Sequence, residues 1–426
     1  MGDRRARPRI VILGSGFAGL ACARALGGKS ADVTLVDRNN YHLFVPLLYQ
    51  VATAALSPAD IAEPIRKIVR RHRNIDVVLG EVVGIDVPAR HVALAGGRRL
   101  AFDRLVLATG SAYNYFGHDA WAVHAPGLKT IDNARQIRTR ILKGFELAEL
   151  TDDPAKQAAL MTTIVVGAGP TGVEVAGAVA ELARYTLARD FRRIDPRRAR
   201  VLLVEAGPRM LTAFPDDLVA YARQRLDRLG VEVMLDHKVE GIRAEGAVVE
   251  GHLIRAQTVI WGAGVRASPA AQWLGVEADR AGRIPVTPDL SVPGLPGIYV
   301  LGDTASTPDA HGQPLPGLAQ VAEQQGQHLG KALAREIETG APLPPFQFRN
   351  RGNTAIIGRN AAIFDFGRGR HLRGFAAWLL WAIVHVYLLV AFDKRLIVTF
   401  QWLWRYLTYQ RGARLITGDG AGEGTP

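Results

Sequence analysis

Two glycine-rich loops with the spacing Gly-x-Gly-x-x-Gly are the parts of this sequence best suited to chemistry. They occupy residues 14–19 and 167–172, and each lies between a short apolar run and a stretch rich in alanine and valine. In a strand–turn–helix unit, such a loop brings backbone N–H groups close to a pyrophosphate. A glycine pattern alone is weak support, so the surrounding elements have to agree with it.

An acidic residue follows the next predicted strand of each unit. Asp37 comes after residues 33–36, and Glu205 comes after residues 201–204. A carboxylate at this strand end accepts hydrogen bonds from a ribose, and Glu205 is expected to favour the 2′-hydroxyl of NADH over the 2′-phosphate of NADPH. Arg209 lies nearby in the sequence and is expected to soften this preference. Two complete units predict two dinucleotide sites.

Glu174 lies in the first turn of the second predicted helix. A carboxylate there stabilises the helix dipole, or it contacts the nicotinamide or a proton-accepting substrate. Its position alone leaves both interpretations open.

Further strand and helix ends supply candidates for holding a flavin. A predicted strand ends at Gly302 and Asp303, where the aspartate binds a ribityl hydroxyl or is an ordinary turn residue. A helix predicted from Leu318 directs its first N–H groups toward a flavin ring. On that helix Gln320 and Gln324 share one face, which binds a ligand or is simply solvated. These features predict FAD on the first unit and a nicotinamide nucleotide on the second.

The composition is that of a folded protein of two or three domains. The chain has 426 residues, of which 48% are hydrophobic and 22% are charged, values typical of globular proteins. Its one cysteine, Cys22, excludes an internal disulfide, a Cys-x-x-Cys redox pair and a cysteine-rich zinc site, and we expect no metal. Cys22 itself is expected to be a small core residue.

The C-terminal residues differ in character from the rest of the chain. Residues 376–392 are nearly all apolar, and Gln401, Arg405 and Thr408 are spaced to form one polar face of a second helix over residues 396–409. Clustered tryptophan and tyrosine suit the headgroup level of a bilayer. We expect a monotopic anchor in the membrane plane. The alternatives are a single span, at the short limit of length, and a soluble core or dimer interface.

The formal net charge of +12 indicates an anionic partner. Because no helix-turn-helix, zinc or RNP pattern accompanies the charge, we expect an anionic lipid surface and no nucleic acid. A basic insert at residues 184–200, between the second helix and its return strand, predicts a solvated helix–loop extension or, alternatively, a partner-binding patch. The N-terminus lacks the pattern of a secretory signal, so we expect synthesis in the cytosol without export.

The chain resembles the type II NADH dehydrogenases, which are single-chain, non-pumping NADH:quinone oxidoreductases with two dinucleotide-binding domains. The resemblance covers nearly the whole chain. The sequences that carry it are DRNNYHLFVPLLYQVATAALSPADIAEPIR at 37–66, LVLATGS at 105–111, VVGAGPTGVEVAGAVAEL at 165–182, YVLGD at 299–303, AQVAEQQG at 319–326 and the tail from GNTAIIGRNAAIFDF to RYLTYQRGARLITG. The long stretch after Asp37 separates this family from other pyridine-nucleotide flavoproteins.

The resemblance assigns roles that spacing alone does not. It implies that residues 108–110 line the FAD with Asp303 on the ribityl chain, and that Glu174 lies beside the nicotinamide and near a quinone pocket. It also implies that Gln320 and Gln324 border the quinone against the flavin. The candidate catalytic residues are Glu174, Gln320 and Gln324. The candidate cofactor-binding residues are Gly14, Ser15, Gly16, Phe17, Ala18, Gly19, Asp37, Arg38, Ala108, Thr109, Gly110, Gly302, Asp303, Leu318, Ala319, Gly167, Gly169, Pro170, Thr171, Gly172, Glu205, Gly262 and Gly264.

Three residues depart from the family pattern. Val45 replaces a glutamine common in this stretch, Glu323 places an acid between the two glutamines, and Arg351 stands where many members carry lysine. These departures concern the shape and charge of the quinone pocket and leave the flavin site as expected.

The predicted fold is α/β, with two Rossmann-like domains of the glutathione reductase type and a C-terminal amphipathic helical region that anchors the chain to a membrane. We expect an FAD-binding domain of residues 1–113 and 288–345, an NADH-binding domain of residues 114–287 inserted into it, and a membrane-association region of residues 346–426.

The predicted reaction is FAD-dependent oxidation of NADH with reduction of ubiquinone or menaquinone in the respiratory chain, without proton pumping. Hydride transfer to a flavin needs no protein nucleophile. With one cysteine, disulfide reductases and sulfide:quinone oxidoreductases are excluded, so electrons leave the flavin directly. The alternatives are an NADH-dependent reductase of a soluble acceptor and a flavin redox sensor without turnover. We expect a peripheral protein on the cytoplasmic face of the inner membrane, with homodimerisation left open.

Overall fold

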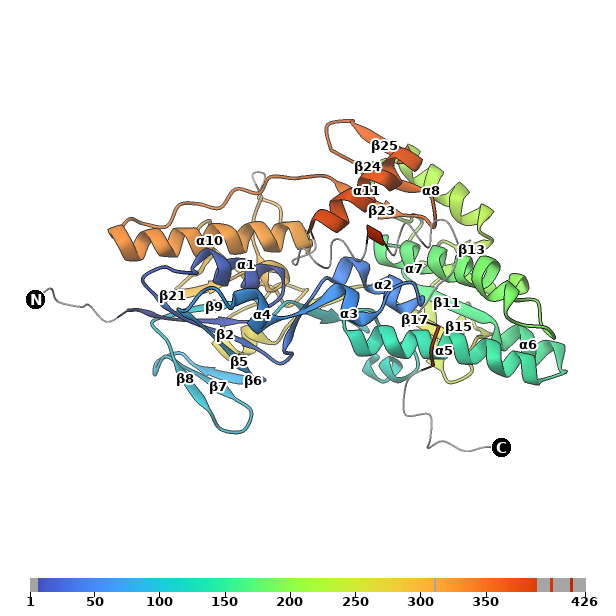
Figure 1. Ribbon diagram of the computed structural model, residues 1–426, viewed down its shortest axis with the longest axis horizontal. Coiled ribbons are helices and arrows are strands. Elements are labelled where there is room, and N and C mark those ends of the chain that lie inside the picture. Colours follow the sequence, from blue (N-terminus) through green and yellow to red (C-terminus); the bar gives the residue numbers. More distant parts are fainter. Residues whose placement is uncertain (1–6, 310–311, 389–398, 401–413, 417–426) are drawn as a thin grey trace, which may run out of the picture. The chain divides into compact units, whose positions relative to one another are not determined.

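The computed structural model describes residues 7–309, 312–388, 399–400 and 414–416, and the chain divides into two compact units (Figure 1). The first unit comprises Met1–Leu43, Ala62–Ala112 and Val265–Arg351, and the second comprises Phe44–Ile61, Tyr113–Gly264 and Gly352–Pro426. The domain boundaries expected from the sequence stay predictions.

A mainly parallel sheet forms the centre of the first unit. Its order is β20 (Ser291–Val292), β21 (Leu295–Val300), β9 (Arg104–Leu107), β1 (Arg9–Leu13), β2 (Asp32–Asp37) and β5 (Ile75–Leu79). All neighbouring pairs are parallel except β20 and β21. Residues 10–13 of β1 are all buried, as expected for a central strand covered on both faces.

Smaller elements complete the first unit. They are β3 (Tyr41–Leu43), β4 (Ala62–Pro64), α4 (Ile65–Val69), β6 (Val82–Asp86), β7 (His91–Leu94), β8 (Arg99–Ala101), β18 (Val265–Ala267), α9 (Ala270–Leu274), β19 (Ile284–Pro285) and β22 (Ala305–Ser306). The strand β10 (Ser111–Tyr113) begins in this unit.

Helices α1 (Phe17–Ala25) and α10 (Ala319–Thr339) pack closely against one another in the first unit (Figure 1). Glycines on α10 permit this approach. A Cβ on Gly326 would lie 2.1 Å from the carbonyl oxygen of Ala18, and one on Gly330 would lie 2.6 Å from that of Cys22. Cys22 is fully buried in this contact, as predicted, and burial raises its pKa to about 12, so it is not a reactive thiolate.

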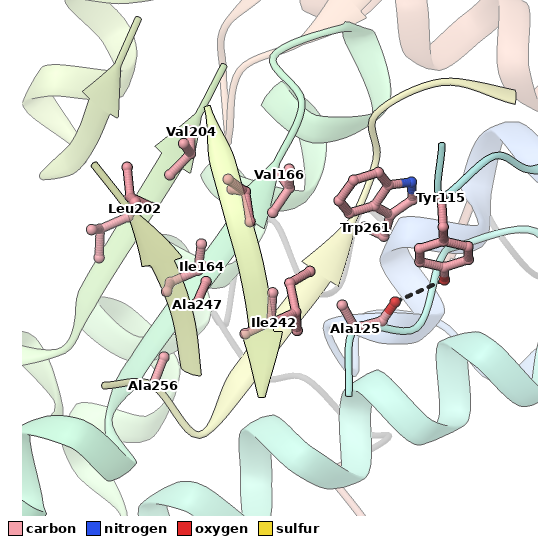
Figure 2. Close-up of a cluster of buried hydrophobic side chains, with 13 residues drawn as sticks. Tyr115, Ala125, Ile164, Val166, Leu202, Val204, Ile242, Ala247, Ala256 and Trp261 are labelled. Atoms are coloured by element: carbon pink, nitrogen blue, oxygen red, sulfur yellow. Dashed lines mark hydrogen bonds between the residues drawn. The ribbon is translucent and has the colours of Figure 1, made fainter. Parts of the chain in front are cut away.

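A parallel sheet of four strands forms the centre of the second unit. Its order is β13 (Val231–Met234), β12 (Arg200–Val204), β11 (Thr162–Val166) and β17 (Thr258–Trp261). An antiparallel sheet adds β14 (Val239–Arg243), β15 (Gly246–Val249) and β16 (His252–Arg255). Figure 2 shows side chains of both sheets in one buried cluster, where the Tyr115 hydroxyl donates to the carbonyl oxygen of Ala125 over 2.8 Å.

Helices and the C-terminal strands surround this sheet. The helices are α2 (Leu48–Ala52), α3 (Pro58–Ile61), α5 (Ile131–Leu150), α6 (Pro154–Leu160), α7 (Pro170–Glu181), α8 (Asp216–Arg228) and α11 (Phe375–Leu388), and the strands are β23 (Asn353–Ile356), β24 (Ala362–Asp365) and β25 (His371–Gly374). Helix α7 contacts β23, and α11 contacts β24 and β25. In the described part of the chain, no helix combines the length and apolar character needed to cross a bilayer.

Two expectations concern segments at the ends of helices. After α7, the basic insert expected as a helix–loop extension consists of short helical turns, over Leu182–Thr186, Leu187–Arg189 and Pro196–Arg198, with loop between them. The second amphipathic segment predicted over residues 396–409 lies outside the described residues, apart from Thr399 and Phe400.

The close contact between α1 and α10 predicts that one added methyl group at Gly326 lowers the stability of the protein. Gly326→Ala should lower the free energy of unfolding by about 1–3 kcal/mol, because its Cβ cannot fit beside the Ala18 carbonyl without moving a helix. A matched control is Gly84→Ala in β6, where the Cβ position has no atom within 4 Å. Urea unfolding followed by circular dichroism would measure both variants, and equal midpoints would contradict the packing argument.

Candidate functional site

The first glycine loop has the geometry of a phosphate-binding turn. Gly14 has φ +95°, a conformation that favours glycine, and a Cβ on Gly19 would lie 1.8 Å from the Gly14 carbonyl oxygen. By contrast, no atom lies within 4 Å of the Cβ position of Gly16. The loop is therefore closed against its own helix and open at Gly16, the N-cap of α1, where a phosphate group fits.

Asp37 binds the loop itself. Its Oδ2 accepts hydrogen bonds from the backbone N–H and the hydroxyl of Ser15, both at 2.7 Å, and its Oδ1 accepts from the N–H of Asn39 at 2.7 Å. A carboxylate has further lone pairs for a ribose. The sequence analysis predicted a ribose contact for Asp37 but did not predict that its carboxylate fixes the loop. Arg38 is exposed beside it.

His42 is a loop-supporting residue that the sequence analysis missed. Its side chain is only 3% exposed, its Nδ1 lies 2.8 Å from the carbonyl oxygen of Ser15, and its ring meets Phe17 edge-on at 5.3 Å between centroids. Burial lowers the pKa of His42, although the contact with Ser15 opposes the shift. The ring is therefore neutral at pH 7, with its proton on Nδ1. In the sequence, the available signal for His42 was its place within residues 37–66, the stretch that carries the family resemblance.

A group of hydroxyls lies at the carboxyl ends of β9 and β21. Thr109 Oγ1 lies 2.5 Å from Ser268 Oγ, and the Ser111 hydroxyl donates to Asp303 Oδ2 over 2.6 Å. Asp303 is thus oriented by a neighbouring serine, while its ribityl contact stays a prediction. Ser111 and Ser268 were not among the predicted site residues, because their roles depend on contacts between distant parts of the sequence.

Gln325 supports the turn that carries Asp303. Its side chain is only 1% exposed, its Oε1 accepts from the N–H of Gly302 at 2.7 Å, and its Nε2 donates to Thr307 Oγ1 over 2.9 Å. The sequence analysis selected Gln320 and Gln324 and passed over this neighbour. No periodic signal distinguishes it, since its partners come from another strand end.

The two predicted glutamines share one face of α10, and that face binds the backbone of residues 349–351. Gln324 Nε2 donates to the carbonyl oxygen of Arg349 over 3.0 Å, and its Oε1 accepts from the same residue's N–H at 3.1 Å. Gln320 Oε1 accepts from the N–H of Arg351 at 3.0 Å. The contacts fix this segment to the helix, while the predicted roles at a quinone stay predictions.

Two of the departures from the family pattern form a pair. The guanidinium of Arg351 lies 3.7 Å from a carboxylate oxygen of Glu323. The acid between the two glutamines is therefore paired with a cation of the same unit. The third departure, Val45, lies exposed on the second unit.

The second glycine loop repeats the first. Gly167 has φ +98°, a Cβ on Gly172 would lie 1.9 Å from the Gly167 carbonyl oxygen, and no atom lies within 4 Å of the Cβ position of Gly169. Pro170 is the first residue of α7 and Thr171 is exposed beside it. The turn at residues 262–264 packs on this loop, and the N–H of Gly262 donates to the carbonyl oxygen of Val166 over 2.7 Å.

Glu205 mirrors Asp37 in the second unit. Its Oε2 accepts from the N–H of Ala168 at 2.7 Å, and its Oε1 accepts from the N–H of Gly207 at 3.0 Å. Arg209 is engaged elsewhere, with Nη1 2.7 Å from Asp216 and Nη2 donating to the Phe214 carbonyl. The structure thus holds the guanidinium on its own loop and away from Glu205, while the ribose contact of Glu205 stays a prediction.

Glu174 lies half-buried on α7, which begins at Pro170 and has no acidic residue in its first turn, so the expected first-turn position is wrong. Burial raises its pKa to about 8, although a hydrogen bond of 3.4 Å from the N–H of Ile356 opposes the shift. The carboxyl is therefore largely protonated at pH 7 and able to donate a proton. The raised pKa favours an acid–base role over the dipole-stabilising role, which requires a charged carboxylate.

Comparisons with known proteins agree with this geometry. Residues 8–326 match the family model for pyridine nucleotide-disulphide oxidoreductases, and residues 350–410 match that for the NDH2 C-terminal domain. The chain is 40% identical to the type II NADH:quinone oxidoreductase Ndh of Mycobacterium tuberculosis, over 97% of this chain and 91% of the relative. A type II NADH:quinone oxidoreductase of Staphylococcus aureus is 30% identical over 84% of this chain and 89% of its own.

A solved structure confirms the predicted fold class. The structure of NDH2 from Plasmodium falciparum in complex with NADH superposes with a TM-score of 0.86 at 20% identity, covering 97% of this chain and 100% of that one. The family models, the relatives and the paired glycine loops confirm the resemblance and its cofactors, FAD and NADH. This chain therefore belongs to the type II NADH:quinone oxidoreductases, within the pyridine nucleotide-disulphide oxidoreductase family.

Proposed function

We propose that this protein oxidises NADH and reduces a membrane quinone, ubiquinone or menaquinone, through bound FAD, without pumping protons. The observation that carries the proposal is the presence of two built dinucleotide loops in a chain whose one cysteine is buried. A relative named type II NADH:quinone oxidoreductase, 40% identical over nearly the whole chain, supports the same activity. Electrons therefore leave without a thiol relay.

The residues of the first unit fit FAD. The open face at Gly16 would accept the pyrophosphate, Asp37 has lone pairs left for the ribose, and Asp303, oriented by Ser111, would bind a ribityl hydroxyl. When bound, FAD accepts a hydride from NADH and passes two electrons to the quinone. The protein has to hold the ring, position both substrates and supply protons.

Glu174 is the proposed proton donor for the quinone. Its carboxyl is largely neutral at pH 7 because burial raises its pKa to about 8. It lies on the helix that follows the nicotinamide-binding loop. Gln320 and Gln324 are proposed to act beside the quinone by holding residues 349–351 in place, where Arg351 also pairs with Glu323.

The protein is proposed to lie peripherally on the cytoplasmic face of the inner membrane, on anionic lipid. Helix α11 supports this location because it exposes apolar side chains one helical turn apart: Phe375, Leu379, Ile383 and Tyr387. Such a stripe suits insertion of one helix face into the headgroup boundary. The same stripe is the surface that the homodimer alternative would use.

Steady-state kinetics tests the proposed activity. Purified holoenzyme should oxidise NADH when a short-chain ubiquinone or menaquinone analogue is supplied, and should do so far more slowly with NADPH. Oxidation of NADH only with a soluble protein acceptor would favour the flavin reductase alternative. The absence of turnover with every acceptor would favour the redox sensor.

Glu205→Ala should raise the KM for NADH by about tenfold or more, because a hydrogen bond to a charged group contributes about 1.5–3 kcal/mol. The preference for NADH over NADPH should narrow, since the acid that repels the 2′-phosphate is gone. Glu245→Ala, which removes an exposed acid of the same unit, is the control. An unchanged KM for NADH would contradict the proposed ribose contact of Glu205.

Glu174→Gln tests the proton donor. The wild-type rate of quinone reduction should fall as the pH rises through about 8, because the carboxyl then loses the proton that it donates. The amide variant should be slower and show no such step. Glu181→Gln, on the same helix and also bound to a backbone N–H, should keep the wild-type profile. A pH step retained in Glu174→Gln would assign it to another group.

Gln324→Ala should slow quinone reduction while leaving reduction of the flavin by NADH intact. The reason is that the variant releases both hydrogen bonds to Arg349 without touching the nucleotide loops. Lys331→Ala removes an exposed side chain from the same helix and serves as the control. If flavin reduction by NADH also slows in Gln324→Ala, this residue acts on the flavin and not on the quinone.

A further inference from the structure

We propose that the basic insert, residues 184–200, is a second membrane-contact surface that binds anionic phospholipid headgroups. The inference rests on the proposed membrane location and adds to it a site separate from the apolar stripe of α11. The insert carries seven arginines and two aspartates, so it is strongly cationic. A cationic surface beside a membrane attracts anionic lipid over about a Debye length.

The insert is a fixed surface, not a loose loop. The Glu149 carboxylate, at the end of α5, accepts hydrogen bonds from the backbone N–H groups of Arg192, Arg193 and Ile194 at 2.9–3.1 Å. Buried residues of the insert, such as Leu187 and Ile194, attach it to the second unit. These contacts fix the backbone of the insert to the second unit, while most of its arginine side chains are exposed to solvent.

Half of the exposed arginines of the insert have no acidic partner. Arg193, Arg197 and Arg200 lie within 4 Å of Asp152, Asp195 and Glu232. The other three exposed arginines, within the described part of the chain, have no carboxylate at salt-bridge distance. They are Arg189, Arg192 and Arg198. Their charges are therefore available to phosphate groups, which bind guanidinium in a bidentate manner.

Tyr185 adds an aromatic side chain to this surface. It is 48% exposed and lies one helical turn before Arg189. An exposed tyrosine among arginines suits the headgroup level of a bilayer, where its ring is half-buried and its hydroxyl hydrated. The composition thus matches a lipid surface better than a purely electrostatic site.

A contact with Arg414, near the C-terminus, supports the membrane as the partner. Arg414, which follows the segment with the amphipathic sequence pattern, forms an ion pair with Asp190 of the insert. The residue that follows this predicted membrane-associated segment in the sequence thus contacts the insert. If the intervening segment lies on a bilayer, as its sequence predicts, the insert lies at the bilayer surface beside its end.

Vesicle binding tests this inference with the FAD-loaded, full-length protein. The variant R189Q/R192Q/R198Q should bind vesicles of phosphatidylcholine mixed with phosphatidylglycerol at least about tenfold more weakly than wild type, the factor expected when basic residues leave an anionic surface. The difference should shrink at high salt and vanish on phosphatidylcholine alone. Flavin absorbance and NADH oxidation with a water-soluble quinone should be unchanged, which verifies folding.

A charge-matched control separates a local contact from net charge. R70Q/R71Q/R73Q removes three exposed arginines of the first unit that also have no carboxylate at salt-bridge distance among the described residues. This control should bind anionic vesicles nearly as wild type does. Equal weakening of both triple variants would overturn the inference in favour of net charge alone.

Three other results of these binding measurements would lead to different conclusions. Wild-type affinity in R189Q/R192Q/R198Q would overturn the insert site while leaving membrane association intact. Failure of the wild-type protein to bind any vesicle would overturn the proposed membrane location itself. Loss of binding to duplex DNA in this variant, with vesicle binding unchanged, would reassign the insert to nucleic acid and overturn the inference.

Discussion

In each nucleotide-binding unit, a loop backbone meets the helix that follows it at a distance that only glycine permits. A Cβ on Gly19 would lie 1.8 Å from one carbonyl oxygen, and a Cβ on Gly172 would lie 1.9 Å from its counterpart. This closure directs the first N–H groups of α1 and α7 toward the loop. It also lets Asp37 and Glu205 accept the N–H of the second loop residue, so each acidic residue fixes the loop of its own unit.

The chain has a single cysteine and therefore no cysteine pair that could relay electrons. Cys22 is buried between two helices and has its pKa raised to about 12, so it cannot relay electrons. We propose that proton supply falls to Glu174, a carboxyl on α7 whose pKa is raised by burial. The chain thus contributes binding, orientation and protons, and leaves the electron chemistry to FAD.

The sequence predicted the features that depend on neighbours along the chain. Both glycine loops, their strand-end acids and the shared face of Gln320 and Gln324 follow from local spacing. It did not predict His42 under the first loop, Gln325 behind Asp303 or the pairing of Glu323 with Arg351. These contacts join residues distant in sequence, so only the folded chain reveals them. The engagement of Arg209 with Asp216 likewise depends on the conformation of its own loop.

The central claim is that one flavin accepts electrons from NADH and returns them to a quinone. Anaerobic stopped-flow absorbance near 450 nm tests it most directly, with NADH mixed first and a soluble quinone analogue second. The account predicts fast bleaching by NADH followed by fast recolouring by the quinone. Bleaching that no quinone reverses would contradict the assignment of quinone as acceptor, and the absence of bleaching by NADH would contradict the assignment of the nicotinamide site.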